Sequence, residues 1–501
     1  MQDLLLGLDI GTSSVKGLII DQTGRILAQS ETPNELISTH IGWAEQDVDR
    51  WKQNTIQLIR TCLDDPLVSS HNIRGIGVSG MVPALVLIDS HGQVLRPAIQ
   101  YNDSRAVQEI QSYREKTGAF SFFYITGANP SVQSIGPKLA WIRHWEPQVW
   151  EKTAWIMGSY DYINYFLTGE ISVERNWALE SGLLDIHLQS WSNTLLSVFD
   201  LPETILPPVR SSLEITGKVS LQTAQITGLV PGTPVIAGSA DHVAAALAAG
   251  ITHPGDVLIK FGSSGDMLYC SDHTVFDPRF YIDFHCLPGK YLPNGCMATS
   301  GSLLKWFVNE FCQQDRIDAK RQDLDVYQYL DQQAEQIPPG SAGITVLPYF
   351  LGAKTPLNDP DARGVFYGMT LSHSRYHLYR AIMESVVYGF RDHFEVLQQL
   401  GLPIVRVVAS EGGAGSPLWR QIAADVLDTP IEFLQANPGS AYGVAVMAGM
   451  ALQIFDVEDL MQIQGAREIS VPNPAAHWQY QSFYQTYHNL YNQLRPVFQS
   501  Q

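Results

Sequence analysis

The sequence predicts an α/β protein made of two similar halves. The chain has 501 residues, which is too long for a single ordinary hydrophobic core. Apolar strand patterns alternate with helical patterns, as in layered α/β proteins with a mostly parallel or mixed sheet. A hairpin pattern near residue 11 occurs again near residue 262, which indicates an internal duplication.

The first half begins with a hairpin over residues 4–21, where two apolar runs flank a turn of small residues. A third strand is expected over 25–30. Apolar residues at helical spacing predict a helix over 47–63, and short strands follow at 73–80 and 84–89. Residues 235–250 then have the pattern of a strand, a turn and an alanine-rich helix that starts near Asp241.

The second half begins in the same way. Residues 256–270 form another apolar hairpin pattern, and its turn Gly262-Ser263-Ser264 is similar to Gly11-Thr12-Ser13. We therefore expect one domain at 1–250 and another at 251–501. Helices are expected at 301–311 and 374–400, and residues 405–427 predict a strand, a glycine-rich loop and a capped helix.

Composition argues against several classes of function. The formal net charge is −18 and no basic run occurs, so a nucleic-acid partner is not expected. No apolar run is long enough to span a membrane. The five cysteines contain no CxxC pair and predict neither a zinc site nor a disulfide framework. The N-terminal residues lack the basic start and cleavage site of a signal peptide, so a cytoplasmic protein is expected.

The two hairpin turns are candidate phosphate-binding sites. Glycine lets the backbone approach a ligand closely, and successive backbone N–H groups in a turn can bind an anion. The hydroxyl groups of Thr12, Ser13 and Ser263 can add hydrogen bonds, and Lys16 lies just beyond the first turn. Each turn alone could be an ordinary hairpin turn, but a matched pair favours phosphate binding.

The loop over residues 411–416 is a third candidate for the phosphate side. Its glycines Gly412 and Gly413 lead into a predicted helix N-terminus, which favours negative charge. The loop has neither the Walker A nor the GxGxxG pattern. Because glycine-rich loops between strands and helices are common, the pattern alone does not identify a site.

Two aspartates end strands at predicted turns. Asp241 opens a helix, so it is either a helix N-cap or a general base that takes a proton from an attacking hydroxyl. Asp9 ends the first strand, so it either bonds the turn backbone or holds a hydrated Mg²⁺ ion.

The segment Gln100–Arg105 is a candidate sugar-binding loop. Asn102, Asp103 and Arg105 could bind sugar hydroxyls, or they could form a polar loop with an internal salt bridge. The residues alone leave both alternatives open.

In their order along the chain, these motifs resemble the FGGY carbohydrate kinases over nearly the whole sequence. LLLGLDIGTSSVKGLIID (4–21) and VLIKFGSSG (257–265) resemble the family's two phosphate motifs. IRGIGVSG (73–80) and RPAIQYNDSRA (96–106) resemble its sugar-side segments, and GSADHVAAALAAG (238–250) resembles the segment with the catalytic aspartate. SGSLLKWF (300–307) and EGGAGSPLWRQIAADVL (411–427) resemble parts of its nucleotide-binding half.

This resemblance implies a two-lobed, actin-like fold of the sugar kinase, heat-shock protein and actin class, with duplicated ribonuclease H-like domains and the active site in the cleft between them. It implies a first domain that mainly binds sugar, a second that mainly binds ATP, and phosphoryl transfer from MgATP to a sugar hydroxyl, in a monomer or homodimer. The implied base is Asp241, and the implied metal ligand is Asp9. The residues implied around the nucleotide are Thr12, Ser13, Lys16, Gly262, Ser263, Gly301, Gly412 and Gly413.

The sequence departs from the family at the sugar segment. Xylulokinase members usually carry Gln-Met-His-Gly after the Ser-Gly of this segment, whereas this chain carries Met81, Val82, Pro83 and Ala84. Val82 is therefore expected to line the sugar site without hydrogen bonding. The polar contacts would come from Asn102, Asp103, Asp241 and His242.

The leading substrate is a ketopentose such as xylulose or ribulose. The alternative is an ATP-binding sugar sensor or degenerate kinase with little turnover, which the presence of Asp9, Lys16 and Asp241 disfavours. The sugar-side segments likewise disfavour an actin-like chaperone or filament protein.

Overall fold

The computed structural model describes residues 3–116, 122–434, 439–460 and 466–500. The chain divides into two compact units. Unit 1 comprises Met1–Thr252, Ile282–Leu292 and Pro438–Gln464, and unit 2 comprises His253–Tyr281, Pro293–Asn437 and Gly465–Gln501. Two later segments of the chain therefore return to unit 1.

Unit 1 is built on a mixed sheet whose central strands are almost wholly apolar. Its path is β13-β14-β5-β1-β2-β3, and β15 also pairs with β5. The strands of this sheet are β1 (Leu4–Ile10), β2 (Ser14–Asp21), β3 (Ile26–Pro33), β5 (Ile73–Gly80), β13 (Ile215–Lys218), β14 (Pro234–Ile236) and β15 (Ser239–Ala240). β1 is antiparallel to β2 and parallel to β5. The predicted hairpin at 4–21 and the strand at 73–80 are confirmed.

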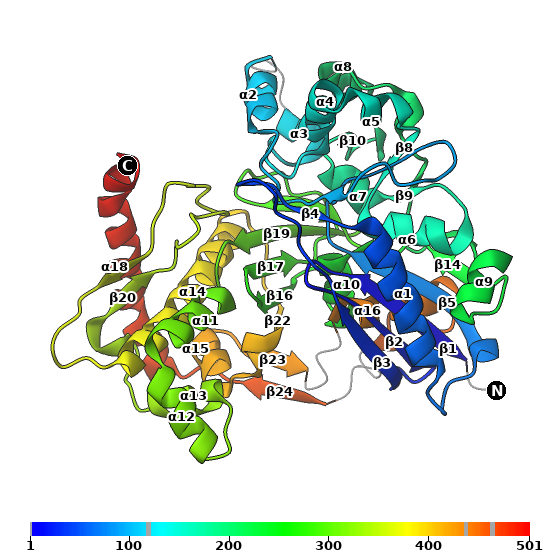
Figure 1. Cartoon of the computed structure of the whole chain (residues 1–501). Helices are drawn as coiled ribbons and strands as arrows, with labels where there is room; N and C mark the ends of the chain where they lie inside the picture. The colour runs from blue at the N-terminus through cyan, green and yellow to red at the C-terminus, as the bar shows by residue number, and fades with distance from the viewer. Residues whose placement is uncertain (1–2, 117–121, 435–438, 461–465, 501) are drawn as a thin grey trace. The chain divides into compact units, whose positions relative to one another are not determined.

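Two helices rich in small residues cover one face of this sheet. α10 (Asp241–Ala248) and α16 (Gly439–Ala451) pack on each other and on the strands, and Figure 1 shows the orange α16 among the blue strands of unit 1. Glycines permit this approach: a Cβ atom on Gly7 would lie 1.9 Å from the Ala441 carbonyl oxygen, and one on Gly77 would lie 2.2 Å from that of Val444.

The other elements of unit 1 surround this sheet or form the segment between Leu85 and Pro208. The helices are α1 (Val48–Leu63), α2 (Val107–Lys116), α3 (Phe122–Thr126), α4 (Ile135–Trp145), α5 (Pro147–Lys152), α6 (Ser159–Thr168), α7 (Arg175–Glu180), α8 (Asn193–Phe199) and α9 (Leu221–Thr227). The short strands are β4 (Glu45–Gln46), β6 (Val86–Ile88), β7 (Ala98–Ile99), β8 (Trp155–Met157), β9 (Val173–Glu174), β10 (Leu184–Asp185), β11 (Ser190–Trp191) and β12 (Val209–Arg210). β18 (Tyr281–Phe284) begins as the chain returns to unit 1.

Unit 2 has the same strand order as unit 1. Its sheet contains the path β19-β17-β16-β22-β23-β24, with β16 antiparallel to β17 and parallel to β22. These strands are β16 (Asp256–Phe261), β17 (Gly265–Tyr269), β19 (Tyr291–Met297), β22 (Arg406–Ser410), β23 (Ile431–Leu434) and β24 (Arg467–Ser470). The path corresponds strand for strand to β3-β2-β1-β5-β14-β13, so the predicted duplication is confirmed.

Long helices bury the sheet of unit 2. The helices are α11 (Gly301–Phe311), α12 (Gln313–Arg321), α13 (Val326–Glu335), α14 (Arg375–Gln399), α15 (Pro417–Leu427) and α18 (Pro474–Phe498), and β20 (Thr345–Leu347) pairs with β21 (Val365–Tyr367). The predicted helices at 301–311 and 374–400 are confirmed. Ser416 caps α15 by accepting a hydrogen bond from the Trp419 backbone N–H, as its position before Pro417 predicts.

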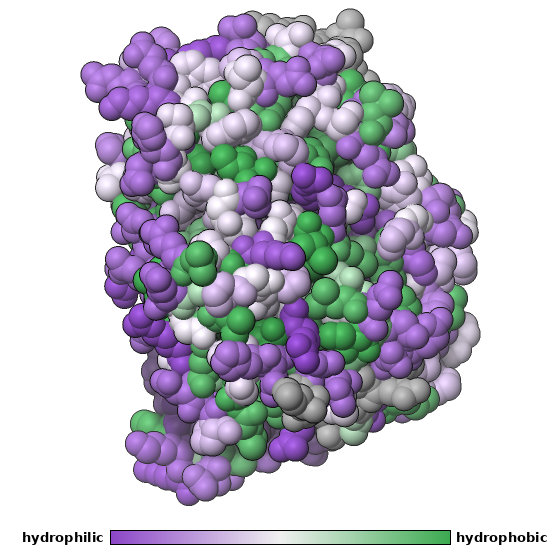
Figure 2. All heavy atoms as spheres, turned by 90° about the vertical axis from the view of Figure 1, so that its right-hand side faces the viewer, coloured by the Kyte–Doolittle hydropathy of each residue, from purple (hydrophilic) through white to green (hydrophobic). Residues whose placement is uncertain are grey.

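The surface mixes polar and apolar residues, and Figure 2 shows green and purple atoms interspersed over the face that it presents. Among the described residues, no helix is both long enough and apolar enough to cross a membrane.

Candidate active site

In unit 1, three neighbouring parallel strands bring the candidate residues to one end of the sheet. Asp9 on β1 lies opposite Ser79 on β5, and Ser79 lies opposite Ser239 on β15. Asp241 follows Ser239 by two residues, as the first residue of α10. Because these strands run parallel, Asp9 and Asp241 are at the same end of the sheet, where α/β proteins bind ligands.

The turn between β1 and β2 is held from several sides. The Gly11 N–H donates to the Ser14 carbonyl oxygen at 3.0 Å, and the Asn34 side-chain amide donates to the Gly11 carbonyl oxygen at 2.8 Å. Gln46 donates to the Thr12 carbonyl oxygen at 2.5 Å. The carbonyl oxygens of the turn are therefore bonded within the protein, while Ser13 is exposed.

The charged residues beside this turn differ in their surroundings. The Ser79 hydroxyl donates to Asp9 Oδ1 at 2.8 Å, so this carboxylate is fixed across two strands. Lys16 lies opposite Asp9 in the hairpin, but its side chain is more than half exposed and its Nζ lies 3.8 Å from Glu31 Oε1. Lys16 can therefore reorient toward a ligand at little cost, because exposed ion pairs are weak.

Asp241 does not cap its helix. The N-cap of α10 is Ala240, and no side chain caps it. Instead Asp241 Oδ1 accepts a hydrogen bond from the His242 N–H at 2.6 Å and lies 3.3 Å from His242 Nδ1. The capping alternative from the sequence is therefore not observed.

His242 links Asp241 to two further acids. Its Nε2 lies 3.1 Å from Asp283 Oδ2 and 3.8 Å from Glu180 Oε1. Burial would lower the pKa of His242, but the charge of Asp283, hydrogen bonds to Asp241 and Asp283, and the charge of Glu180 raise it well above its usual value. Burial, followed by the charge of Asp283, raises the pKa of Glu180 well above its usual value.

Glu180, His242 and Asp283 are also the residues in the described ranges that could hold a metal ion, because one ligand atom of each lies within 4.8 Å of the others. A histidine binds a metal through a neutral ring nitrogen. Because both ring nitrogens of His242 face carboxylates, the ring is placed to donate to Asp241 and to Asp283, as in an ion-pair cluster.

The segment over Met81–Ala84 follows β5 and is buried. The Ser159 hydroxyl donates to the Met81 carbonyl oxygen at 3.0 Å, and the Trp177 indole N–H donates to that of Ala84 at 2.8 Å. The Val82 side chain is itself buried. This apolar segment is thus packed, and hydrogen bonds to its backbone hold it in place.

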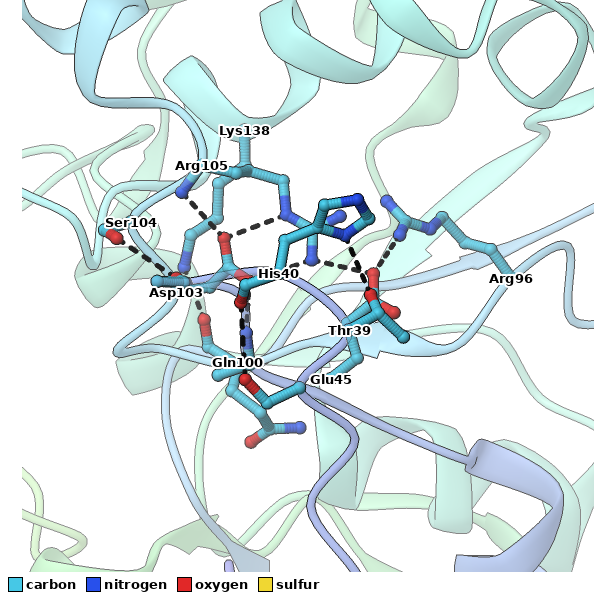
Figure 3. Close-up of polar contacts among 12 residues, drawn as sticks. Thr39, His40, Glu45, Arg96, Gln100, Asp103, Ser104, Arg105 and Lys138 are labelled. Carbon is cyan, nitrogen blue, oxygen red and sulfur yellow. Dashed lines mark hydrogen bonds and ion pairs between the residues drawn. The ribbon is translucent and has the colours of Figure 1, made fainter.

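Asp103 forms the internal ion pair that was one alternative from the sequence. Arg105 donates to both of its carboxylate oxygens at 2.8 Å, and the Ala44 N–H donates to Oδ2 at 2.6 Å (Figure 3). Burial would raise the pKa of Asp103, but the hydrogen bonds from Arg105 and Ala44 lower it. The adjacent Asn102 is exposed.

A wider network holds this loop in place. Arg105 also donates to Glu45 Oε1 at 2.7 Å and stacks over Trp43 with its guanidinium carbon 3.9 Å from the ring centroid. Arg96 pairs with the same Glu45 oxygen, and both arginines point toward this carboxylate in Figure 3. Lys138 is fully buried and donates to the Gln100 carbonyl oxygen at 2.7 Å. Burial lowers the pKa of Lys138 to about 7, against an opposing effect of Asp103.

In unit 2, the second hairpin turn is joined to the N-terminus of α11. The Gly301 N–H donates to the Gly262 carbonyl oxygen at 2.7 Å, and the Ser300 N–H donates to that of Ser263 at 3.0 Å. A Cβ atom on Gly301 would lie 2.8 Å from the Gly262 carbonyl oxygen, so glycine is required for this approach. The Ser263 side chain is exposed at the turn.

The glycine-rich loop packs against the same strand end. A Cβ atom on Gly413 would lie 2.8 Å from Phe261 Cβ and 2.9 Å from the Phe261 carbonyl oxygen, whereas Gly412 is exposed. Unit 2 therefore brings together Gly262, Ser263, Gly301 and Gly413, which the sequence predicts from three separate segments.

Two charged residues of unit 2 were not among the sequence candidates. Lys260 is largely buried at the end of β16, and its Nζ lies 3.7 Å from Asp266 Oδ2 and 3.6 Å from Glu411 Oε1. Glu411 has φ of 71° and ψ of 178°, a conformation that is essentially restricted to glycine. The lysine within the apolar run VLIKF was a signal that could have identified this position.

Comparison with protein families gives a match over most of the chain. Residues 4–248 match the N-terminal domain of the FGGY family of carbohydrate kinases, and residues 257–452 match its C-terminal domain.

Individual relatives are similar over nearly their full length. The chain is 30% identical over 497 residues to the xylulose kinase of Bacillus subtilis strain 168, covering 98% of this chain and 97% of that protein. It is 28% identical to the xylulose kinase of Escherichia coli strain K12, covering 99% of this chain and 100% of that protein. The crystal structure of xylulose kinase from Rhodospirillum rubrum matches with a TM-score of 0.90 and 39% identity, covering 99% of this chain and 100% of that one.

Proposed function

Because this chain belongs to the FGGY family of carbohydrate kinases, we propose that it phosphorylates a ketopentose, with xylulose as the first candidate substrate. Membership in the family makes the chain a phosphotransferase that uses ATP and acts on a small sugar. Its two repeated α/β units have the actin-like fold of sugar kinases.

Similarity supports xylulose as the substrate, and the segment over Met81–Ala84 is where this chain departs from xylulokinases. The relatives at 30% and 39% identity are both named xylulose kinases. The buried segment over Met81–Ala84 offers apolar contact where xylulokinase members of the family carry polar side chains. We assign sugar contacts to Val82, to the exposed Asn102 and to Asp241. Arg105 and the Ala44 N–H donate hydrogen bonds to the carboxylate oxygens of Asp103. We therefore propose that Asp103 holds the loop over Gln100–Arg105 in place and does not contact the sugar.

Asp241 is proposed as the general base, and its location carries the proposal. It follows β15 at the same end of the parallel strands as Asp9, and it is the first residue of α10 rather than its N-cap. A carboxylate here can accept the proton of the sugar hydroxyl as that oxygen attacks phosphorus. Because phosphoryl transfer depends mainly on alignment and charge neutralisation, the base contributes only part of the rate.

The chain's residues also fit a magnesium ion. Asp9 supplies a hard carboxylate oxygen that is oriented by Ser79, and Mg²⁺ is usually held by one or two carboxylates together with water and phosphate oxygens. When bound, the ion would neutralise charge on the transferring phosphoryl group. We assign Asp9 as its protein ligand.

The remaining candidates are proposed to hold the nucleotide. Thr12, Ser13 and Lys16 lie at the first turn, and Gly262, Ser263, Gly301, Gly412 and Gly413 surround the second. To these we add Lys260. Its ammonium group lies near the turn end of β16, 3.6 Å from Glu411 Oε1 at the start of the glycine-rich loop, so it would place a cation close to a polyphosphate bound there.

A sugar panel tests this function directly. ADP release from MgATP is measured with ketopentoses, aldoses, polyols and glycerol at equal concentrations. The proposal predicts that one ketopentose has a kcat/KM far above that of the other sugars. ATP binding without stimulation by any sugar would instead favour the alternative, a sugar sensor or degenerate kinase.

A further inference from the structure

We propose that His242 is a positioning residue for Asp241, and that as an imidazolium held between Asp241 and the acids Asp283 and Glu180 it fixes the orientation and the charge of the base. This role rests on the proposed function, in which Asp241 is the general base. His242 would therefore act through Asp241, whereas the sequence predicted a direct contact between His242 and the sugar.

The geometry of His242 is set from both sides of its ring. Nδ1 lies 3.3 Å from Asp241 Oδ1, and the His242 backbone N–H donates to the same oxygen at 2.6 Å. On the opposite edge, Nε2 lies 3.1 Å from Asp283 Oδ2 and 3.8 Å from Glu180 Oε1. A cationic ring donates from both nitrogens, so it suits acceptors on both edges.

The partners of His242 come from different elements of unit 1. Asp283 lies on β18, and its side chain is only 2% exposed, while Glu180 is the last residue of α7. A buried carboxylate needs a counter-charge or hydrogen bonds to remain stable. His242 supplies that charge to Asp283 and at the same time faces Asp241, so it couples the buried acid to the base.

The titration behaviour of the cluster agrees with this arrangement. Asp241 on α10, Glu180 on α7 and Asp283 on β18 are the charged groups that act on His242, and together they raise its pKa despite burial. The direction of this shift agrees with a ring that donates from both nitrogens. A cation beside Asp241 favours the ionised carboxylate, which is the form that can accept a proton.

The charge of His242 has a predictable effect on the pH dependence of turnover. In the reaction, the O–H bond of the sugar breaks and its proton passes to Asp241, while the sugar oxygen bonds to the γ-phosphorus of ATP and the bond between that phosphorus and ADP breaks. Below the pKa of Asp241 the base is already protonated and kcat falls. Removing the adjacent cation should raise that pKa, because the negative charge of Asp241 loses its cationic neighbour while the carboxyl groups of Asp283 and Glu180 remain close by.

The test is the pH profile of kcat for His242→Gln and for His242→Gln/Asp283→Asn, with the best sugar from the panel and saturating MgATP. We expect the acid limb of His242→Gln to move to higher pH by about one unit. The double variant also removes the negative charge of Asp283, so its acid limb should return part of the way toward that of the wild type. The KM for ATP should stay unchanged in both variants.

The outcomes of these measurements distinguish a wrong positioning role for His242 from a wrong assignment of Asp241 as the general base. If both variants are folded by circular dichroism and turn over sugar with an unshifted acid limb, the positioning role is overturned. If the single variant does not fold, the charge-reduced double variant alone decides, because it also lacks the imidazolium and should still show a raised acid limb. Asp241→Asn with near-wild-type turnover would instead overturn the general-base assignment in the proposed function.

Discussion

Lys260 and Asp266 lie directly opposite each other in the β16–β17 hairpin, with Nζ 3.7 Å from Oδ2. The equivalent positions of the β1–β2 hairpin hold Asp9 and Lys16, so the two repeats carry the same pair with the charges exchanged. Lys260 also lies opposite Ser410 on β22, as Asp9 lies opposite Ser79 on β5. The duplication thus gives one hairpin an acid suited to a metal and the other a cation suited to phosphate.

Lys260→Met should therefore weaken nucleotide binding. Loss of one cation near a polyphosphate should raise the KM for ATP by about tenfold, or about 1.4 kcal/mol, with a smaller change in the KM for sugar. Steady-state kinetics, with ATP and the sugar varied in turn, measures the two KM values. Lys320→Met, at an exposed position on α12, is the matched control and should leave both KM values unchanged. An unchanged KM for ATP in Lys260→Met would remove Lys260 from the nucleotide site.

Glu411→Gly should stabilise the protein. The backbone of Glu411 has φ of 71°, where a side chain costs about 1–3 kcal/mol and glycine is free of that cost. Its ion pair with Lys260 is 3.6 Å long and the Glu411 side chain is 44% exposed, so its loss should cost less than about 1 kcal/mol. Thermal unfolding should show a higher Tm for Glu411→Gly. Glu411→Ala retains the strained backbone, so an equal rise in Tm for this variant would contradict the explanation.

Arg105→Ala should strongly destabilise unit 1. Arg105 holds both oxygens of Asp103, bonds Glu45 and stacks on Trp43, so its removal leaves buried charge uncompensated. Breaking such a buried pair costs about 3–5 kcal/mol. Arg143→Ala is the control, because Arg143 pairs with an exposed Asp200 and its loss should cost less than about 1 kcal/mol. Similar unfolding free energies for the two variants would show that the buried network contributes little.

Lys138 should make stability depend on pH. Its pKa is lowered from 10.5 to about 7, so between these values the unfolded chain binds the proton more readily than the folded one. Stability should therefore rise with pH in this window, by about 2 kcal/mol between pH 7 and pH 9. The wild type should gain this amount relative to Lys138→Met in denaturant unfolding. A difference between the two proteins that stays constant with pH would contradict the lowered pKa.

Local patterns were sufficient to predict the hairpins, the glycine-rich loop and the helix that begins at Asp241. Each of these depends on neighbouring residues, such as Gly262 with Ser263 or Ser416 with Pro417. The internal duplication could also be inferred from the repeated turn, whereas the strand order of the two sheets comes from the structure. By contrast, nothing local indicated that α16 packs on the first sheet, although Gly7 and Gly77 are the residues that permit it.

The rest of the site depends on contacts between distant segments. Glu180 and Asp283 belong to no motif, and only folding brings them to His242. Asp103 illustrates the same limit, because the sequence cannot show whether a carboxylate faces a ligand or a buried arginine. Lys260 could have been identified from the sequence, because a charged residue within an apolar strand must be solvated, paired with an opposite charge or bound to a ligand.

The most direct test of the central claim compares sugar-dependent ADP formation by the wild type and by Asp241→Asn. The account predicts that the wild type turns over a ketopentose, and that the variant folds, binds ATP with unchanged affinity and loses roughly 10²–10⁴ in kcat. Near-wild-type turnover by the folded variant would contradict the assignment of Asp241 as the base that makes this chain a sugar kinase.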